Sequence, residues 1–438
     1  MRVFREIFDN KTTRAAGIIF LLILAVVVFN VYSKLPEDYP LFGVLLFSAV
    51  PLLFILGGLV FVFAILVRSV TRSKLVFLMS AGALGIMLLV VGGYQLVDFT
   101  DSVAFCGRLC HTVMYPEYTV YQASPHSRVH CVSCHVGPGA GYLVKSKLAG
   151  VPLIFSTITR SYDRPIATPV HSLRPARDTC EECHRPERYT GEFVLQHTTY
   201  AEDEQNTSST DTRIFNVGGG QGGTAQGIHW HIASTVYYLP LDQARQDIAY
   251  VRVVTSNGEE VDYISPSQED QVTDERIKKD ERLMDCVDCH NRATHQFNSP
   301  EILLDNAFAQ GELDASLPYL KREASQALDP ANSSLDEAYA KVEAIADFYR
   351  TNYPQVYQQK SAEIASDIDA IKGIAQLTTF PYMRVTWDTY LNNIGHQNAP
   401  GCFRCHGNLV AQAGPTKGEI LSADCSLCHF ILPGPIPK

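Results

Sequence analysis

The sequence predicts a mainly α-helical fold with much irregular structure, in which three N-terminal transmembrane helices precede an extracytoplasmic domain with a small β-hairpin insertion. Three observations predict it: long apolar runs in the first hundred residues, an acidic remainder, and cysteines spread through that remainder in regular pairs. The 438 residues are 46% hydrophobic and 19% charged, as in folded chains rather than disordered or fibrous ones. The net charge of −10 argues against a nucleic-acid partner, because such proteins carry basic patches.

The apolar runs cover residues 15–32, 41–67 and 75–97 and contain no charged side chain. Each has about 18 residues or more, which is enough for a helix to cross a hydrocarbon core of about 30 Å. Basic residues gather before the first run and between the second and third, so the positive-inside rule predicts a cytoplasmic N-terminus. The chain beyond Asp98 is then expected outside the membrane. The alternative is that these runs are buried helices of a soluble core.

The twelve cysteines form six pairs, and each pair is followed at once by a histidine. Five pairs have CxxCH spacing, and the first has one additional residue. CxxCH is the attachment signature of c-type haem, in which two thiols bond to the haem and the histidine ligates its iron. The sequence therefore predicts six covalently bound haems, held by Cys106 and Cys110 with His111, Cys131 and Cys134 with His135, Cys180 and Cys183 with His184, Cys286 and Cys289 with His290, Cys402 and Cys405 with His406, and Cys425 and Cys428 with His429.

Other cysteine chemistries explain this pattern less well. Zinc ribbons pair CxxC units but do not need a histidine after each one. Redox CxxC motifs usually occur singly, near a βαβ pattern. Structural disulfides would leave the six trailing histidines unexplained. Haem attachment also agrees with the expected outward placement of this domain.

Six irons require further ligands on the side opposite the motif histidine. Eight histidines remain, and all of them follow residue 111, so the apolar runs cannot hold a histidine-ligated b haem. His130 and His197 are the weakest candidates. His229 and His231 alternate, so on a strand they would share one face. The distal-ligand candidates are Met114, His126, His171, His229, His231, His295 and His396.

Residues 105–150 resemble the NapC/NirT/NrfH family of membrane-anchored multihaem quinol dehydrogenases, and the resemblance is strong over about residues 99–190. Three helices with a longer haem domain resemble in particular the ImcH-type inner-membrane cytochromes. The resemblance rests on Met114, the Ser-Pro-His stretch ending at His126, the motif Cys131–His135 and Lys147. It implies that quinol is oxidised beside the first haem. Because the first motif is longer here and Met114 follows His111 by three residues rather than two, the axial ligation of the first haem stays open.

The expected function is quinol oxidation at the periplasmic face of the bacterial inner membrane. Lys147 could bind the oxygen of menaquinol or ubiquinol, because a compact ammonium suits an oxyanion. Proton acceptors could be Asp98, Asp101 or Glu117, and each of these also reads as a solvated interfacial carboxylate. Electrons would leave to a periplasmic cytochrome or reductase. The alternatives are a haem-wire subunit of a larger membrane complex without its own quinol site, and a terminal reductase of a small nitrogen compound.

Four segments are expected along the chain. Residues 1–98 form the membrane anchor, 99–190 carry haems 1–3, 191–285 form an insertion, and 286–438 carry haem 4, a helical scaffold and haems 5 and 6. Within them we expect a loop over 204–227 and a hairpin over Tyr250–Ile264 with a tight Asn257-Gly258 turn. Helices are expected over Leu335–Tyr349 and Gln358–Leu377.

Overall fold

The computed structural model describes residues 72–435, apart from residues 110, 138, 170–173, 186–190, 220–225, 256–257 and 397–398. The chain divides into two compact units. The first comprises Met1–Tyr115 with His130–Val132, and the second comprises Pro116–Val129 with Ser133–Lys438. The apolar runs predicted over 15–32 and 41–67 lie outside the described residues.

The described part of the first unit is helical. Helix α5 spans Arg72–Asp101, and a π-helical turn over Ala104–Leu109 follows it and contains Cys106. A π-helical turn holds one residue more than an α-helical turn, which fits the extra residue of the first cysteine motif. Phe99 packs edge-on against Phe105, with ring centres 5.6 Å apart, and fixes the turn against the end of α5. Helix α6 then begins at His111 and runs to Gln122.

The prediction of three transmembrane helices needs correction. In the described residues, no helix combines the length and the apolar character needed to cross a membrane. The span predicted over 75–97 lies inside α5, where glycine, serine and glutamine interrupt the apolar run and charged residues flank it.

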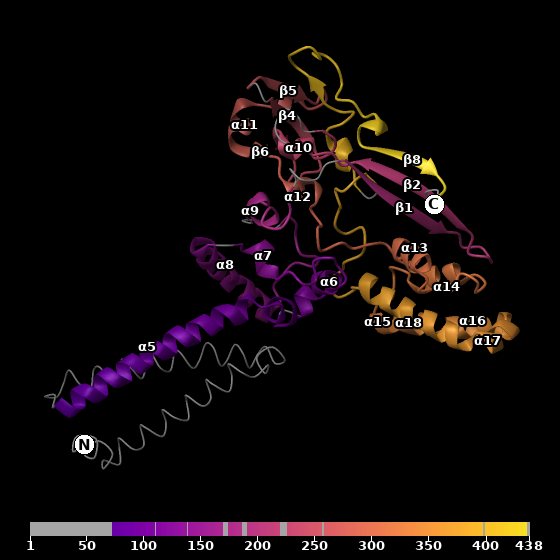
Figure 1. The fold of residues 1–438 in the computed structure, drawn as a ribbon, viewed down its shortest axis with the longest axis horizontal. Coiled ribbons are helices and arrows are strands. Elements are labelled where there is room, and N and C mark those ends of the chain that lie inside the picture. The colour runs from indigo at the N-terminus through magenta and orange to yellow at the C-terminus, as the bar shows by residue number, and fades with distance from the viewer. Residues whose placement is uncertain are drawn as a thin grey trace. The chain divides into compact units, whose positions relative to one another are not determined.

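The second unit contains two antiparallel sheets rather than one small hairpin, so the fold class is corrected in this respect too (Figure 1). A three-stranded sheet has the order β1-β2-β8, and a five-stranded sheet has the order β6-β3-β4-β5-β7. The strands are β1 (Glu192–Tyr200), β2 (Ser208–Asn216), β3 (Thr235–Pro240), β4 (Ile248–Val254), β5 (Glu260–Ile264), β6 (Arg282–Leu283), β7 (Val410–Ala411) and β8 (His429–Pro433).

Two predictions from the sequence, a hairpin and a loop, concern residues of these strands. The expected hairpin is β4 and β5, which pair from Tyr250↔Ile264 to Val254↔Glu260, but its connection is longer than a two-residue turn. Residues 208–216 were expected in a loop because the segment 204–227 is rich in Ser, Thr, Gly and Gln; instead they form β2. Thr210, Thr212, Ile214 and Phe215 favour a strand, and pairing on both sides, with β1 and β8, stabilises it.

The remaining helices of the second unit fall into two groups. The first group precedes residue 300 and consists of short helices apart from the 20-residue α8, whereas the helices after residue 300 form a separate packed body (Figure 1). The first group is α7 (Cys131–His135), α8 (Ala140–Thr159), α9 (Arg177–Cys180), α10 (Trp230–Ala233), α11 (Asp274–Asp280) and α12 (Cys286–Cys289). The second group is α13 (Pro300–Gln310), α14 (Leu320–Ala327), α15 (Leu335–Glu343), α16 (Ile345–Asn352), α17 (Pro354–Gln359) and α18 (Ser361–Thr378).

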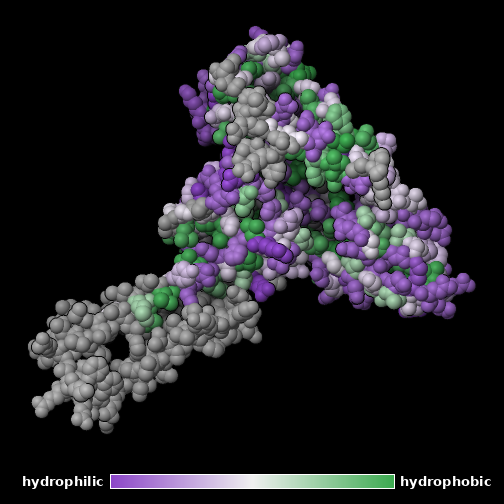
Figure 2. All heavy atoms as spheres, viewed as in Figure 1, coloured by the Kyte–Doolittle hydropathy of each residue, from purple (hydrophilic) through white to green (hydrophobic). Residues whose placement is uncertain are grey.

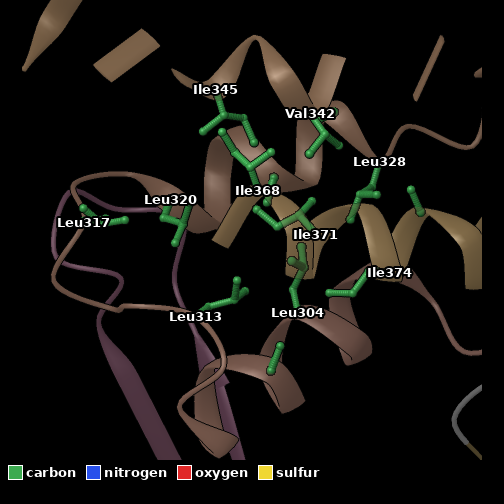
Figure 3. Close-up of a cluster of buried hydrophobic side chains, with 14 of the residues drawn as sticks. Leu304, Leu313, Leu317, Leu320, Leu328, Val342, Ile345, Ile368, Ile371 and Ile374 are labelled. Atoms are coloured by element: carbon green, nitrogen blue, oxygen red, sulfur yellow. The ribbon is translucent and has the colours of Figure 1, made fainter. Parts of the chain in front are cut away.

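The second group surrounds a hydrophobic core (Figure 3). Ser299 caps α13 by accepting from the Ile302 amide at 3.3 Å, and Ser334 caps α15 in the same way from Glu337 at 3.1 Å. Fully buried side chains such as Leu304 and Ile371 each stabilise the fold by about 1.5–3 kcal/mol. The helices predicted on either side of Pro354 are therefore present, divided into four shorter ones.

A buried ion pair joins this helical body to the β1–β2 hairpin. Lys321 on α14 binds Asp305 on α13, and both side chains are almost fully buried. The same carboxylate accepts the main-chain amide of Tyr200, at the end of β1, at 3.0 Å. The Tyr200 ring stacks on Phe308 with centres 4.9 Å apart. The cysteine-free body is thus fixed to the strands that lead toward the last cysteine motif.

Candidate haem-iron sites

Each described CxxCH motif of the second unit lies on a short helical turn. Helix α12 consists of the four residues Cys286–Cys289, and comparable turns follow Pro400 and Asp424. Residues three apart on such a turn project to the same side, so both thiols of a motif face one way. The histidine then directly follows the turn. This is the arrangement that two thioether bonds and one axial ligand require.

Among the side chains that the structure describes, five motif histidines each face a second histidine from elsewhere in the chain. The separations of the ring centres fall between 5.9 and 6.5 Å. The pairs are His135 with His295 at 6.2 Å, His184 with His126 at 6.0 Å, His290 with His229 at 6.5 Å, His406 with His231 at 5.9 Å, and His429 with His396 at 6.1 Å.

These separations fit an iron atom held between two imidazoles. A metal–imidazole bond is about 2 Å long, so two such bonds on opposite sides place the ring centres about 6 Å apart. Direct stacking would bring the rings closer. In the described residues, no three or more His, Cys, Asp or Glu side chains are grouped to share one ion. The residues present therefore suit a metal that takes two protein ligands, as the iron of a haem does.

The partner histidines come from distant segments, so spacing in the sequence could not pair them. His295 follows the fourth motif by five residues but faces His135 of the second motif. His396 lies just before the fifth motif but faces His429 of the sixth. His126 faces His184 of the third. In each case the chain supplies a ligand to a neighbouring site.

His229 and His231 do not lie on a strand, which corrects that expectation. His229 caps α10, and His231 lies in its first turn. Residues two apart on a helix project about 200° apart, so the two rings face opposite ways. His229 accordingly meets His290, and His231 meets His406. One short helix thus supplies ligands to two adjacent sites.

Two of the partner histidines, His231 and His295, are held in the form that binds metal. The Nδ1 atom of His295 donates to the Glu117 carbonyl at 3.1 Å, and that of His231 donates to the Ile228 carbonyl at 2.9 Å. Each bond leaves Nε2 as the free lone pair, oriented by the main chain. Desolvation lowers the pKa of His231, and it lowers that of His295 to about 4, so both rings are neutral. Neutral imidazole is the ligating form.

The cysteine motifs also lie against one another. The thiols of Cys180 and Cys286 are within hydrogen-bonding reach, which brings the third and fourth motifs together. Cys402 and Cys428 do the same for the fifth and sixth motifs. In the first unit, Cys106 meets Cys131. Electron transfer between haems depends on such closeness of their attachment points.

The candidates for quinol binding fall in both units. Asp98, Asp101 and Met114 belong to the first unit, and Glu117 and Lys147 belong to the second. Asp98 is exposed near the end of α5, and Met114 is half-buried on α6. Lys147 is half-buried on α8.

Glu117 is the one candidate acid that is buried, with 9% exposure. Burial raises its pKa, and the nearby Arg292 guanidinium opposes that shift. Arg292 stacks over the Tyr390 ring at 4.2 Å, and burial together with the charge of Glu117 raises the pKa of Tyr390 to about 12. Since the Glu117 carbonyl also orients His295, this polar cluster adjoins the site of the second motif. Sequence reasoning named Glu117 but missed Arg292 and Tyr390, because neither has a motif.

The other residues named from the sequence are His197, His130, His171 and Cys110. His197 on β1 binds Arg213 at 2.9 Å and faces Asp211 at 3.4 Å, so it belongs to a cross-strand polar cluster. His130 is exposed. His171 and Cys110 lie outside the described residues. The second axial ligand of the first haem, for which Met114 is a candidate, stays a prediction.

Comparison with known proteins agrees with this reading. The model of the N-terminal region of the NapC/NirT cytochrome c family matches residues 68–171. The chain is 40% identical over 421 residues to the cytochrome c-type protein ImcH of Geobacter sulfurreducens, which covers 90% of this chain and 82% of that protein. No solved structure matches the chain. Identity at this level over most of both chains shows that this protein belongs to the NapC/NirT cytochrome c family, whose members carry covalently bound haem c.

Proposed function

We propose that this protein is a quinol dehydrogenase that oxidises a membrane quinol and passes its electrons through six covalently bound haems to a periplasmic cytochrome or reductase. The observation that carries the proposal is the set of five facing histidine pairs beside CxxCH motifs. An iron with two histidine ligands has no open position for a substrate, so it serves electron transfer. This favours a carrier of electrons over a terminal reductase.

The chain's own residues have two tasks in quinol oxidation. The substrate loses two electrons and two protons, so its oxygen must be bound and its protons accepted. We assign the binding of the oxygen to the Lys147 ammonium. Asp98, Asp101 and Glu117 are the proposed proton acceptors, and the raised pKa of Glu117 suits an acid that holds a proton for a time. Bound haem supplies the one-electron acceptor for this reaction.

Helix α8 supports a lipid-facing position for this substrate site. Its residues Leu148, Val151, Leu153, Ile154, Phe155 and Ile158 are 45–75% exposed, and all of them except Leu153 recur at helical spacing on one face. The segment 139–162 contains three basic residues and no acidic one. An exposed apolar stripe flanked by cations is typical of a helix that lies in the surface of an anionic bilayer. Figure 2 shows hydrophobic side chains at the surface of the second unit.

The length of the stripe agrees with a helix in the plane of the membrane. From Leu148 to Ile158 the helix rises about 15 Å, or half of a hydrocarbon core of about 30 Å. Lys147 directly precedes the stripe, at the depth where an ammonium group would meet headgroups. A quinol dissolved in the lipid could reach its side chain there without leaving the bilayer.

Reduction by quinol tests the proposal. The holoprotein in proteoliposomes should be reduced by menaquinol or ubiquinol analogues, followed by haem absorbance. Lys147→Ala should slow this reduction at least tenfold and Lys147→Arg should slow it less, while dithionite still reduces every haem. Lys145→Ala, two residues earlier on the same helix, is the matched control and should react normally. No reduction of the unmodified protein by any quinol analogue would instead favour a haem-wire subunit of a larger complex.

A further inference from the structure

One carboxylate joins the third and fourth cysteine motifs. The Asp285 side chain caps α12 by accepting from the Cys286 amide at 2.7 Å. It also accepts the amides of Ala176 at 2.5 Å and Arg177 at 3.1 Å, where α9 begins. Two short helices therefore share a single cap: α12, which holds both cysteines of the fourth motif, and α9, which ends at the first cysteine of the third. The Arg177 guanidinium is directed elsewhere, to the Ile232 carbonyl at 2.9 Å.

One guanidinium joins the fourth and fifth motifs. Arg404 lies between the two cysteines of the fifth motif and is only 9% exposed. It donates to the main-chain oxygen of Asp288, inside the fourth motif, at 2.6 Å. It also donates to the carbonyls of Arg245 at 2.9 Å and Gly401 at 2.8 Å. Its bonds to the described residues are thus all made with main-chain oxygens, and no carboxylate among those residues neutralises its positive charge.

The charge of Asp288 is matched locally. Its buried carboxylate accepts from the Tyr238 hydroxyl at 2.6 Å and from the Arg245 guanidinium at 3.1 Å. It also accepts the amide of Asp285 at 2.7 Å. Asp288 and Arg245 therefore balance each other, and the charge that is left at this junction is that of Arg404.

The two junctions thus carry opposite charges. Asp285, together with Glu181, is the charge that acts on Cys180 at the third motif. Arg404 is the cation that acts on Cys405 at the fifth motif. A nearby anion stabilises the oxidised, more positive form of a haem, and a nearby cation stabilises the reduced form. Such effects are large where water is excluded.

We propose that Asp285 and Arg404 are positioning residues that hold the third, fourth and fifth haem motifs as one segment and direct electrons from the third toward the fifth. Each transfer moves one electron and no proton, and no bond forms or breaks. The inference rests on the proposed haem attachment but not on quinol oxidation. It can therefore be tested with a chemical reductant, and its failure would leave the quinol assay unaffected.

The test is a spectroelectrochemical redox titration of the full holoprotein, with covalent haem content measured by intact mass. Arg404→Gln removes the cation and should shift the midpoint potential of one or two haems downward, leaving the others unchanged. Arg404→Lys keeps the charge and should restore most of the potential. Asp285→Asn keeps a capping oxygen and should shift one or two haems upward. Arg350→Gln, an exposed cation of α16, should shift none.

The opposite signs make the proposal falsifiable. It is overturned if Arg404→Gln and Asp285→Asn shift potentials in the same direction, or if neither shifts any. It is also overturned if Arg404→Lys behaves like Arg404→Gln, since the charge would then be irrelevant. If Arg404→Gln loses haem, the midpoint potentials of Asp285→Asn and Arg404→Lys still test the proposal.

Discussion

Replacing His231 tests the assignment of histidine pairs most sharply. Its ring centre lies 5.9 Å from that of His406, and its Nδ1 is fixed on the Ile228 carbonyl, so its Nε2 is the atom assigned to the iron. His231→Ala removes that ligand and leaves the rest of the fifth motif intact. With six motifs in the chain, one haem in six should change from low to high spin.

The assay is electron paramagnetic resonance of the fully oxidised holoprotein, with the high-spin signal quantified per haem. His229→Ala should convert a different haem, the one paired with His290, so the double variant should show two high-spin haems in six. His197→Ala is the matched control, because its ring binds Arg213 rather than facing a motif histidine. A high-spin signal in the control, or none in His231→Ala, would refute the assignment.

Three further predictions concern stability and the membrane. Lys321→Met strands the buried Asp305 carboxylate and should lower the free energy of unfolding by about 3–5 kcal/mol in denaturant titration, whereas Arg350→Met in an exposed pair should change nothing measurable. Burial raises the pKa of Asp367 to about 6 from 3.8, so the folded state binds the extra proton. The free energy of unfolding should then fall as pH rises from about 4 to 6, by on the order of 3 kcal/mol, and calorimetry of Asp367→Asn should show a flatter profile over that range. In proteoliposomes, a lipid-dissolved photoreactive probe should label peptides containing Val151 and Phe155, and Phe155→Asp should reduce that labelling; equal labelling of the exposed Phe193 on β1 would contradict a specific lipid contact.

The cysteine motifs could be predicted from the sequence because their chemistry is local. Two thiols and a histidine must lie within one helical turn, so their spacing alone identifies the motif, as at Cys286–His290. The helices around Pro354 could be predicted for a similar reason, because the periodic spacing of apolar residues along the sequence indicates which helix face is buried.

The partners of the motif histidines could not be predicted, because which histidine faces which motif depends on tertiary contacts. His295 lies five residues after one motif and serves another, and no local rule anticipates that. The shared cap at Asp285 is equally nonlocal, because it joins segments more than a hundred residues apart. Strand β2 was missed because Ser, Thr, Gly and Gln dominate the longer segment 204–227 that contains it, and pairing with a strand on each side stabilises it.

Hydropathy led to one wrong expectation. The residues of α5 form a long helix with an apolar run, but the structure does not support the predicted span over 75–97 as a transmembrane helix. Exposed apolar residues gather instead on one face of α8, which composition alone did not single out. The relation of such a stripe to a lipid surface depends on exposure, which only the folded chain reveals.

Intact mass of the purified protein under denaturing conditions tests the central claim most directly. Denaturation strips every group that is not bonded to the chain, so only thioether-linked haem stays attached. The account predicts one species of 48.6 kDa polypeptide plus six haem groups. A mass equal to the polypeptide alone, with its cysteine thiols reactive, would contradict it.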